Sequence, residues 1–180
     1  MKKSIFIFRR DFRIIDNIGF INCYKNSDII IPIFIFTPEQ ITNNKYKSNN
    51  AVQFMCESLL DLNKQLKYKL NLFHGNYLHI IKHFKKYKIT DIYTNTDYSP
   101  YAIKRDKQIY KLCKQININF NIFHDICLIS PGNIKNKQNN YYQKFTPFYN
   151  QYLKLDIAKP TKIKINFNKI EKLNIKKINI

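Results

Sequence analysis

The stretch Ser4-Ile5-Phe6-Ile7-Phe8 runs directly into Arg9-Arg10-Asp11-Phe12-Arg13, and Asp16-Asn17 follows shortly after. The apolar run has the length and composition of a buried β-strand. A strand this short cannot bury the charged residues behind it, so those residues must lie in a loop at the carboxyl end of the strand. Open α/β sheets place their ligand crevices at that edge. The beginning of the chain therefore predicts an α/β sheet with a ligand site in the loop after its first strand.

Through residue 123, short runs rich in Ile and Phe alternate with longer segments of helical character. We expect strands at 5–8, 29–36, 70–73, 91–94 and 119–123, and helices at 17–24, 51–67, 77–86 and 101–114. Short strands separated by helices form right-handed βαβ units with a parallel sheet. The expected fold class is therefore α/β, a Rossmann-like three-layer domain with a five-stranded parallel sheet.

Two local patterns support these helices. Phe54, Leu59, Leu62 and Leu66 recur at helical spacing and predict one face that is buried against the sheet. Asp16-Asn17 precedes the first helix, and both residue types are preferred as N-caps.

The character of the sequence changes beyond the last expected strand. Ser130-Pro131-Gly132-Asn133 punctuates the chain, and from Ala158 onward the sequence is low-complexity Lys, Ile and Asn without a helix or core signature. We expect one domain over residues 1–130 and a linker or tail over residues 131–180. The aromatic segment 141–152 is the candidate for an apolar patch that contacts a partner.

The chain has 180 residues, enough for one well-packed domain. Lys and Arg total 31 against 12 Asp and Glu, a net charge of +19 that is typical of proteins with polyanionic partners such as nucleic acid. A second interpretation is a bias toward Lys, Asn and Ile of the kind an AT-rich genome imposes. The charges are dispersed along the chain, and scattered charges usually form a solvated surface.

Cysteine usage and hydropathy indicate the compartment. Cys23, Cys56, Cys113 and Cys127 stand singly without a C-x-x-C pair, so neither a zinc site nor a disulfide framework is expected. The apolar run behind Lys2-Lys3 is too short for a secretory signal, and no stretch is long enough to span a membrane. We expect a soluble intracellular protein with reduced thiols and no membrane partner, in the cytoplasm, the nucleus or a viral factory.

The chain contains only three glycines, Gly19, Gly75 and Gly132, which excludes a G-x-G-x-x-G loop and a Walker A loop. A pocket must then be built from side chains in the loops after the first, second and fourth strands. His79 and His83 are spaced i, i+4 on an expected helix, but no third metal ligand stands near them in the sequence. A solvated helix face is the preferred interpretation, and no metal is expected.

Three arginines in the first loop suggest an anionic ligand. Arg9, Arg10 and Arg13 have forked donors that match a carboxylate or a phosphate. The alternative is a network with Asp11 and Asp16 that fixes the loop, because such pairs form readily between neighbours in the sequence.

An acid and an aromatic ring, Asp97 and Tyr98, stand just past the fourth strand and suit a flat heteroaromatic ligand. The alternative is a helix entry, with Ser99 as N-cap and Pro100 at the first helical position. Part of this sequence pattern is therefore explained by helix capping and not by ligand binding.

Four stretches in the same order resemble the DNA photolyase and cryptochrome family. They are FRRDFR-x-x-DN at 8–17, IPIFIFTPEQI at 31–41, QFMCESLLDL at 53–62, and NTDYSPY at 95–101 with Arg105-Asp106. The resemblance covers about residues 4–150 and ends with Tyr142 and FTPFY at 145–149. It implies that residues 1–130 are a photolyase-like antenna domain and that residues 131–180 lead towards a helical FAD-binding domain.

Members of this family hold a light-harvesting antenna, either a reduced folate or a deazaflavin, in a crevice of this domain. The residues that the resemblance places at this site are Arg10, Phe36, Gln40, Asp97, Tyr98 and Tyr101. An Asp at the position of Asp97 is similar to a deazaflavin contact, whereas folate-binding members tend to have an Asn-Glu pair where this chain has Tyr101-Ala102. The resemblance therefore favours deazaflavin over reduced folate. Thr37 departs from the Asp that often follows the second strand.

A complete family member also has a larger helical domain that binds FAD and admits the flipped-out lesion of DNA, and it usually reduces the flavin through tryptophans. This chain ends before that domain and contains no Trp. We therefore expect the antenna-binding part of a deoxyribodipyrimidine photolyase-like protein in light-dependent DNA repair. Its expected partners are an FAD-binding half on a separate chain and, through that half, DNA; alone it is expected to be inactive.

Two alternatives stay open beside this hypothesis. One is a stand-alone interaction module, cryptochrome-like or nucleotide-binding, without a catalytic role. The other is a relic of a split gene, although the regular hydrophobic patterning through Phe123 argues against extensive decay.

Overall fold

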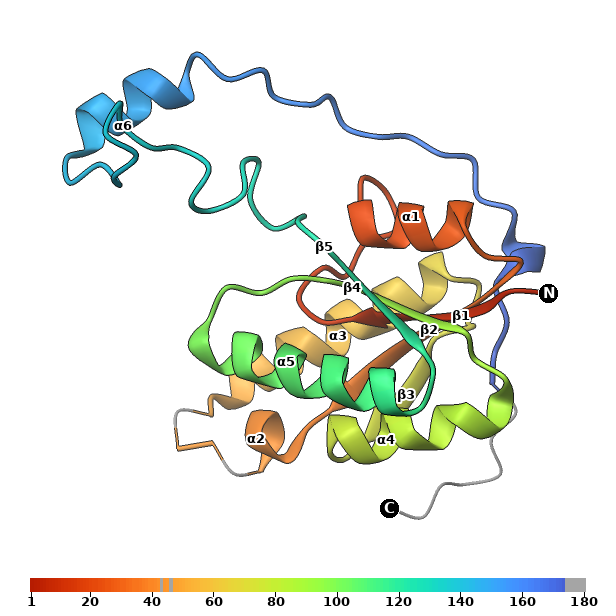
Figure 1. Ribbon diagram of the computed structural model, residues 1–180. Helices are drawn as coiled ribbons and strands as arrows, with labels where there is room; N and C mark the ends of the chain where they lie inside the picture. The colour runs from red at the N-terminus through yellow and green to blue at the C-terminus, as the bar shows by residue number, and fades with distance from the viewer. Residues whose placement is uncertain (43, 46, 174–180) are drawn as a thin grey trace.

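A five-stranded, fully parallel sheet with the strand order β3-β2-β1-β4-β5 forms the centre of the computed structural model, which describes residues 1–42, 44–45 and 47–173 (Figure 1). The strands are β1 (Lys3–Phe8), β2 (Ile29–Phe36), β3 (Asn71–His74), β4 (Asp91–Asn95) and β5 (Asn119–Phe123). Each of them overlaps the run that the sequence pattern indicated, so the predicted fold class is confirmed.

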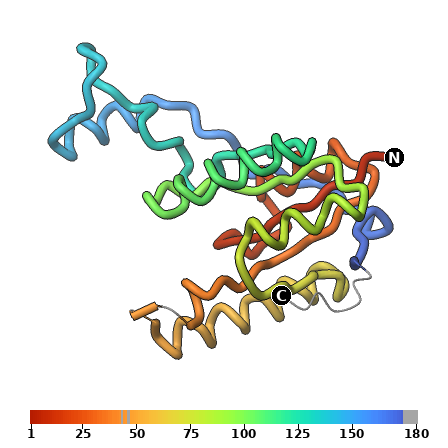
Figure 2. Tube along the Cα trace, turned by 60° about the horizontal axis from the view of Figure 1, so that its bottom comes forward, coloured from red at the N-terminus to blue at the C-terminus, as the bar shows by residue number. Residues whose placement is uncertain are grey.

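Helices cover both faces of this sheet and complete the three layers (Figures 1 and 2). One face carries α1 (Ile18–Lys25) and α3 (Asn49–Gln65), and the other carries α4 (Tyr77–Phe84), its 3-10 continuation η1 (Lys85–Tyr87) and α5 (Pro100–Gln115). The shorter elements are α2 (Pro38–Ile41), α6 (Phe145–Tyr152) and η2 (Phe167–Lys169). Among the helices of the described residues, none is both long and apolar enough to cross a membrane.

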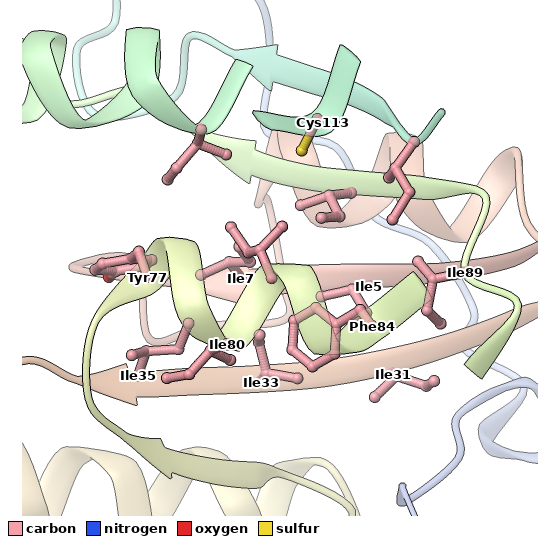
Figure 3. Packing of buried hydrophobic residues seen from close by; sticks show 14 residues of the cluster. Ile5, Ile7, Ile31, Ile33, Ile35, Tyr77, Ile80, Phe84, Ile89 and Cys113 are labelled. Carbon is pink, nitrogen blue, oxygen red and sulfur yellow. The ribbon is translucent and has the colours of Figure 1, made fainter. Parts of the chain in front are cut away.

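The two faces of the sheet bury different side chains. Along β1, Ile5 and Ile7 point to the layer of α4 and α5, while Phe6 and Phe8 point to the layer of α1 and α3; all four are completely buried. Figure 3 shows the isoleucines of β1 and β2 packed beneath Ile80 and Phe84 of α4. Strands buried on both faces need no polar alternation, which explains the continuous apolar runs in the sequence.

The helix starts follow the capping residues. Asn17 caps α1 by accepting a hydrogen bond from the Phe20 backbone N–H, and Ser99 caps α5 by accepting one from Ala102. Asp16 has another role, because its backbone is left-handed with φ 51° and its carboxylate accepts a hydrogen bond from the Thr161 N–H. Of the two expected caps at this helix, only Asn17 serves as one.

One expectation about α3 is wrong. Leu59, Leu62 and Leu66 are buried as the spacing predicts, but Phe54 is 72% exposed. The first half of α3 contains no fully buried residue, and before Leu59 only the partly buried Met55 packs against the core among its apolar residues in the described part of the chain. Helical periodicity identifies an apolar face but not the point along the helix where that face gains a partner.

Beyond β5 the chain leaves the sheet, forms α6 far from it, and returns to the sheet's other end (Figures 1 and 2). There Ile170 is completely buried and forms a parallel bridge with Ile30, whose carbonyl accepts the Glu171 N–H at 2.9 Å. The expectation that nothing after Ala158 belongs to the core is therefore wrong. A single apolar anchor in a Lys, Ile and Asn background has no periodicity to reveal it.

Candidate functional site

The candidate site lies where the carboxyl ends of β1 and β4 meet. The chain builds β2 and β3 on one side of β1, then crosses over to build β4 and β5 on the other side. Loops after β1 and β4 therefore diverge, and such a topological switch point leaves a crevice in open α/β sheets. The sequence segments 9–13 and 95–101 are brought together by this topology.

Three buried polar side chains fix the floor of this switch point. Asn95 at the end of β4 donates through Nδ2 to the Asp11 carboxylate and to Asn17 Oδ1 at 2.8 Å. Asn17 donates to the same Asp11 carboxylate at 3.1 Å, and Asp11 also accepts the Arg9 backbone N–H at 2.9 Å. Asp11 thus accepts hydrogen bonds from one backbone N–H and two side-chain amides, and it does not form the arginine pair that the alternative interpretation predicted.

Replacing Gly19 by alanine is expected to lower the free energy of unfolding by about 1–3 kcal/mol, the cost of overpacking a filled interior. The Gly19 N–H donates to Asn95 Oδ1 at 2.9 Å, and a Cβ at this position would overlap that oxygen. Urea unfolding followed by circular dichroism measures the change. Asn22→Ala, in the same helix but away from this contact, is the control. Equal stabilities of the two variants would contradict this account of the switch point.

A buried ion pair lies beneath the crevice. Arg9 donates through Nη1 and Nη2 to the two carboxylate oxygens of Asp106 at 2.9 and 2.8 Å, and Arg105 donates through Nε at 2.9 Å. The side chains of Arg9 and Asp106 are less than a tenth exposed. This arrangement joins β1 to α5 and positions Arg105 beside the crevice.

The crevice itself has a volume of about 440 Å³. Its walls come from the loop after β1, from α2 after β2, from the start of α4 and from the segment that leads from β4 into α5. The residues that carry its chemistry are Arg10, Glu39, Gln40, Tyr77, Asp97, Tyr101 and Arg105. A second hollow of about 250 Å³ shares Tyr77, Tyr101 and Arg105 with the first and extends it along α5.

Asp97 supplies a fixed negative charge at the rim. Burial by itself raises the pKa of Asp97, but the hydrogen bond from the Ser99 backbone N–H and the charge of Arg10 outweigh it, so the pKa lies below the ordinary value. Arg10 Nε stands 3.6 Å from the carboxylate, and the Arg10 side chain is 74% exposed. The pair presents an acceptor and an exposed cation to a ligand at neutral pH.

Aromatic rings flank a guanidinium on the opposite wall. The Arg105 Cζ lies 5.4 Å from the Tyr77 ring centre and 5.8 Å from that of Tyr101, within the range of cation–π attraction. Tyr77 is buried, and this burial raises the pKa of its phenol. Tyr101 is about half exposed, and Arg105 Nη2 is buried with no hydrogen-bond partner among the described residues. A ring can stack on Tyr101 while an anionic group accepts from Arg105.

Of the six residues that the resemblance places at the site, the structure brings four into the crevice, namely Arg10, Gln40, Asp97 and Tyr101. Phe36 lies outside it and packs edge-to-face on Phe34 at 4.8 Å. Tyr98 points toward β5, where its hydroxyl is hydrogen-bonded to His124 Nδ1 at 2.7 Å. The loops after β1, β2 and β4 contribute to the crevice as predicted.

Sequence reasoning missed Glu39, Tyr77 and Arg105 as crevice residues. The spacing of Tyr101 and Arg105, four residues apart on a helix, was a usable signal, because such side chains lie on one face. Tyr77 follows a strand without a motif and had no comparable signal. In the described part of the chain no group of three or more His, Cys, Asp or Glu side chains is arranged to hold a metal, and His83 Nδ1 lies 2.8 Å from the His79 carbonyl.

The other arginine of the first loop serves the fold. Arg13 donates to the Asp125 carboxylate and to the Asp16 carbonyl, both at 2.8 Å, and so connects the loop after β1 to the exit from β5. The alternative of a local network with the Asp11 and Asp16 carboxylates is wrong, because the carboxylates that pair with Arg9, Arg10 and Arg13 are Asp106, Asp97 and Asp125.

Comparison with known proteins finds similarity to photolyases and cryptochromes. The family model described as DNA photolyase matches residues 4–164. A deoxyribodipyrimidine photo-lyase of Buchnera aphidicola subsp. Baizongia pistaciae is 32% identical over 157 residues, which are 82% of this chain and 33% of that protein. Cryptochrome-1 of Aedes aegypti is 29% identical over 125 residues, which are 64% of this chain and 23% of that protein. The chain thus spans about a third or less of the length of these relatives.

Solved structures agree with these relatives. A crystal structure of an archaeal photolyase from Sulfolobus tokodaii, described as containing two FAD molecules and implying a novel light-harvesting cofactor, superposes with a TM-score of 0.79 at 37% identity. The match covers 90% of this chain and 37% of that one. A Synechocystis cryptochrome superposes with a TM-score of 0.80 at 18% identity, covering 89% and 35%, and shows the shared fold.

Proposed function

Because the chain belongs to the DNA photolyase family, we propose that its crevice holds a light-absorbing antenna chromophore and that the domain serves light-dependent DNA repair. The observation that carries the proposal is the combination of the half-exposed ring of Tyr101 with the unpartnered, buried Nη2 of Arg105. A planar chromophore with an anionic substituent satisfies both groups.

Each of the crevice residues contacts a different part of the chromophore. Tyr101 stacks on the chromophore ring, and ionised Asp97 accepts a hydrogen bond from a ring N–H. Arg10 and Arg105 hold anionic groups, with the second hollow along α5 giving room for a side chain of the chromophore. The bound group supplies absorption of near-ultraviolet or blue light and transfer of the excitation energy.

A deazaflavin fits this set better than a reduced folate. Asp97 accepts from a ring N–H, and Tyr101-Ala102 stands where folate-binding members tend to have an Asn-Glu pair. The Sulfolobus protein, described as containing two FAD molecules, makes a flavin the second candidate. A tricyclic ring is common to both.

The chain spans about a third of the length of the photolyases that it matches, and we propose that an FAD-binding domain is its partner and that DNA is contacted through that domain. The segment around α6 supports this part of the proposal. No residue of α6 is buried, and Tyr141 and Phe145 are 62% and 73% exposed. Aromatic side chains at such exposure are typical of a surface that a partner covers.

The test is a fluorescence titration of the purified chain with 8-hydroxy-5-deazaflavin, FAD and methenyltetrahydrofolate. We expect binding of a tricyclic chromophore, and we expect Tyr101→Ala to weaken it by about tenfold, close to the worth of one aromatic stacking contact. Tyr98→Ala is the matched control, because this tyrosine lies outside the crevice. Equal losses in both variants, or binding of none of the three chromophores, would contradict the proposal. In a parallel titration with ATP, binding of ATP alone would favour a nucleotide-binding module.

A further inference from the structure

Lysines gather at the edge of the sheet opposite the crevice. Helices in βαβ units run antiparallel to the strands, so their carboxyl ends lie at the same edge as the amino ends of the strands (Figure 1). We call this surface the lysine pole; it consists of Lys2 and Lys3 at the start of β1 and of Lys25, Lys64, Lys82, Lys85, Lys86 and Lys114 in the last turns of α1, α3, α4, η1 and α5. The lysines are scattered along the sequence but collected in space.

The arginines of the chain are distributed differently from these lysines. All four arginines lie at or near the crevice edge, and each forms an ion pair with an acid there. Within the lysine pole, ion pairs in the described residues involve only Lys2 with Asp91 and Lys3 with Glu171. The other six lysines of the pole form no ion pair among the described residues, whereas all four arginines at the crevice edge are paired.

Helix dipoles account for part of this arrangement. A lysine near a helix carboxyl end stabilises the fold by about 0.3–1 kcal/mol. One lysine in each last turn would serve that purpose, yet Lys85, Lys86 and Lys88 follow Lys82 at the end of a single helix. Like charges this dense repel one another unless an anion lies between them, so the surplus favours a polyanionic partner.

The lysine pole is hollowed beside the edge strand β5. The hollow has a volume of about 750 Å³, and its walls include Lys2, Asn26, Tyr110, Lys114, Asn119 and Asn121. Tyr110 is 53% exposed, so its ring is available for stacking. Cations, amides and an exposed ring in one concave surface are the groups that contact phosphates, base edges and base faces.

One acid lines the hollow and has an unsatisfied oxygen. Asp91 is 3% exposed, and its Oδ1 accepts from Asn119 Nδ2 at 3.2 Å and pairs with Lys2 at 3.2 Å. Its Oδ2 is buried without a hydrogen-bond partner among the described residues. A ligand amino group is the kind of donor that this oxygen lacks, and the bases adenine and cytosine carry one.

We propose that the lysine pole binds single-stranded nucleic acid, with Lys114 and its neighbours on the phosphates and Tyr110 stacked on a base inside the hollow. A duplex does not present free base faces to a hollow, whereas a single strand does. A bilayer surface is flat and would leave the hollow empty. The proposal is independent of the antenna site, which lies at the other edge of the sheet.

The experiment measures binding of the full chain to a fluorescein-labelled single strand of about 12 nucleotides by anisotropy. The test variant is Lys25→Gln/Lys85→Gln/Lys114→Gln, with one lysine from each of three elements of the pole. The control is Lys135→Gln/Lys137→Gln/Lys144→Gln, which removes the same charge from the segment around α6. We expect a loss of at least about tenfold in the test variant and less than about twofold in the control, as follows from loss of phosphate contacts.

Salt dependence and stacking give two further readouts. The slope of log K against log salt concentration should fall by about 0.7 for each phosphate contact removed. Tyr110→Ala should weaken binding by about tenfold, within the range for one stacked base, whereas Tyr141→Ala should not. Equal effects of the two lysine variants, no effect of Tyr110→Ala, tighter binding of a duplex, or binding of phosphatidylserine vesicles without binding of the oligonucleotide would each overturn the proposal. Chromophore titration of the same samples separates its failure from that of the antenna site.

Discussion

Asp106→Ala is expected to lower the free energy of unfolding by about 3–5 kcal/mol, the cost of leaving a buried charge without its partner. The variant leaves two guanidinium groups without a carboxylate, because Asp106 accepts from Arg9 and Arg105, and the side chains of Arg9 and Asp106 are less than a tenth exposed. Stabilities of small domains are about 5–15 kcal/mol, so the loss is a large part of the total. Urea unfolding followed by circular dichroism measures it.

Two comparisons make this result interpretable. Asp61→Ala removes an exposed carboxylate from α3 and should change the stability by less than about 0.5 kcal/mol. The double variant Arg9→Met/Asp106→Leu removes Asp106 together with the Arg9 charge, so it leaves only Arg105 unpaired and should be more stable than Asp106→Ala, which leaves both arginines unpaired. A loss below about 1 kcal/mol in Asp106→Ala would contradict the structural role assigned to this ion pair.

Ile170→Ala is expected to cost about 2–5 kcal/mol, the range for truncating a fully buried isoleucine. Ile170 is 0% exposed and is surrounded by the core of the α1 and α3 layer. Its neighbours hold the same return of the chain, since Lys169 Nζ donates to the Ser27 carbonyl at 3.0 Å and the Leu173 N–H donates to Asn71 Oδ1 at 2.9 Å. Loss of the anchor should therefore release residues 165–173 together.

Hydrogen exchange distinguishes this release from general destabilisation. In Ile170→Ala the Glu171 N–H, which donates to Ile30, should lose its protection before the amides of β1 do. Ile157→Ala, at a position that is 38% exposed in the outgoing segment, serves as control and should leave both unchanged. Uniform loss of protection through the domain in Ile170→Ala would contradict a local anchor.

The sheet could be predicted from the sequence because its strands are buried on both faces. The runs at 5–8 and 29–36 have no polar interruption, and this is the signature that burial between two helical layers imposes. Asn17 and Ser99 could be predicted as helix caps for a second reason. A cap binds the residues next to it, so its pattern in the sequence is local. The burial of Ile170 could not be predicted, because it depends on where the returning chain meets the sheet.

The candidate site also has features that the sequence predicts and features that it does not. Arg10, Gln40, Asp97 and Tyr101 follow strands whose carboxyl ends share one edge, so their proximity follows from the topology. The partners of the arginines did not follow, because Arg9 and Asp106 are 97 positions apart and only the packing of α5 on the sheet brings them together. Neighbours in sequence, Asp11 and Asp16, were the wrong carboxylates for the same reason.

The lysines are a third feature that the sequence predicts only in part. Along the chain the lysines appear dispersed, and a compositional bias explains their number. Because every α/β unit returns its helix end to the same edge, lysines in the last turns of different helices come together on one surface once the chain folds. Charge number is a property of the sequence, whereas charge density belongs to the fold.

The central claim is that a chromophore occupies the crevice at the carboxyl ends of β1 and β4. The most direct measurement is the two-dimensional ¹⁵N–¹H spectrum of the 180-residue chain, recorded while a deazaflavin or flavin is added. The account predicts the largest shifts at the backbone amides of Arg10, Gln40, Asp97 and Tyr101, with little change at Asn119 and Asn121 on the opposite edge. Shifts confined to the opposite edge, or none at saturating chromophore, would contradict it.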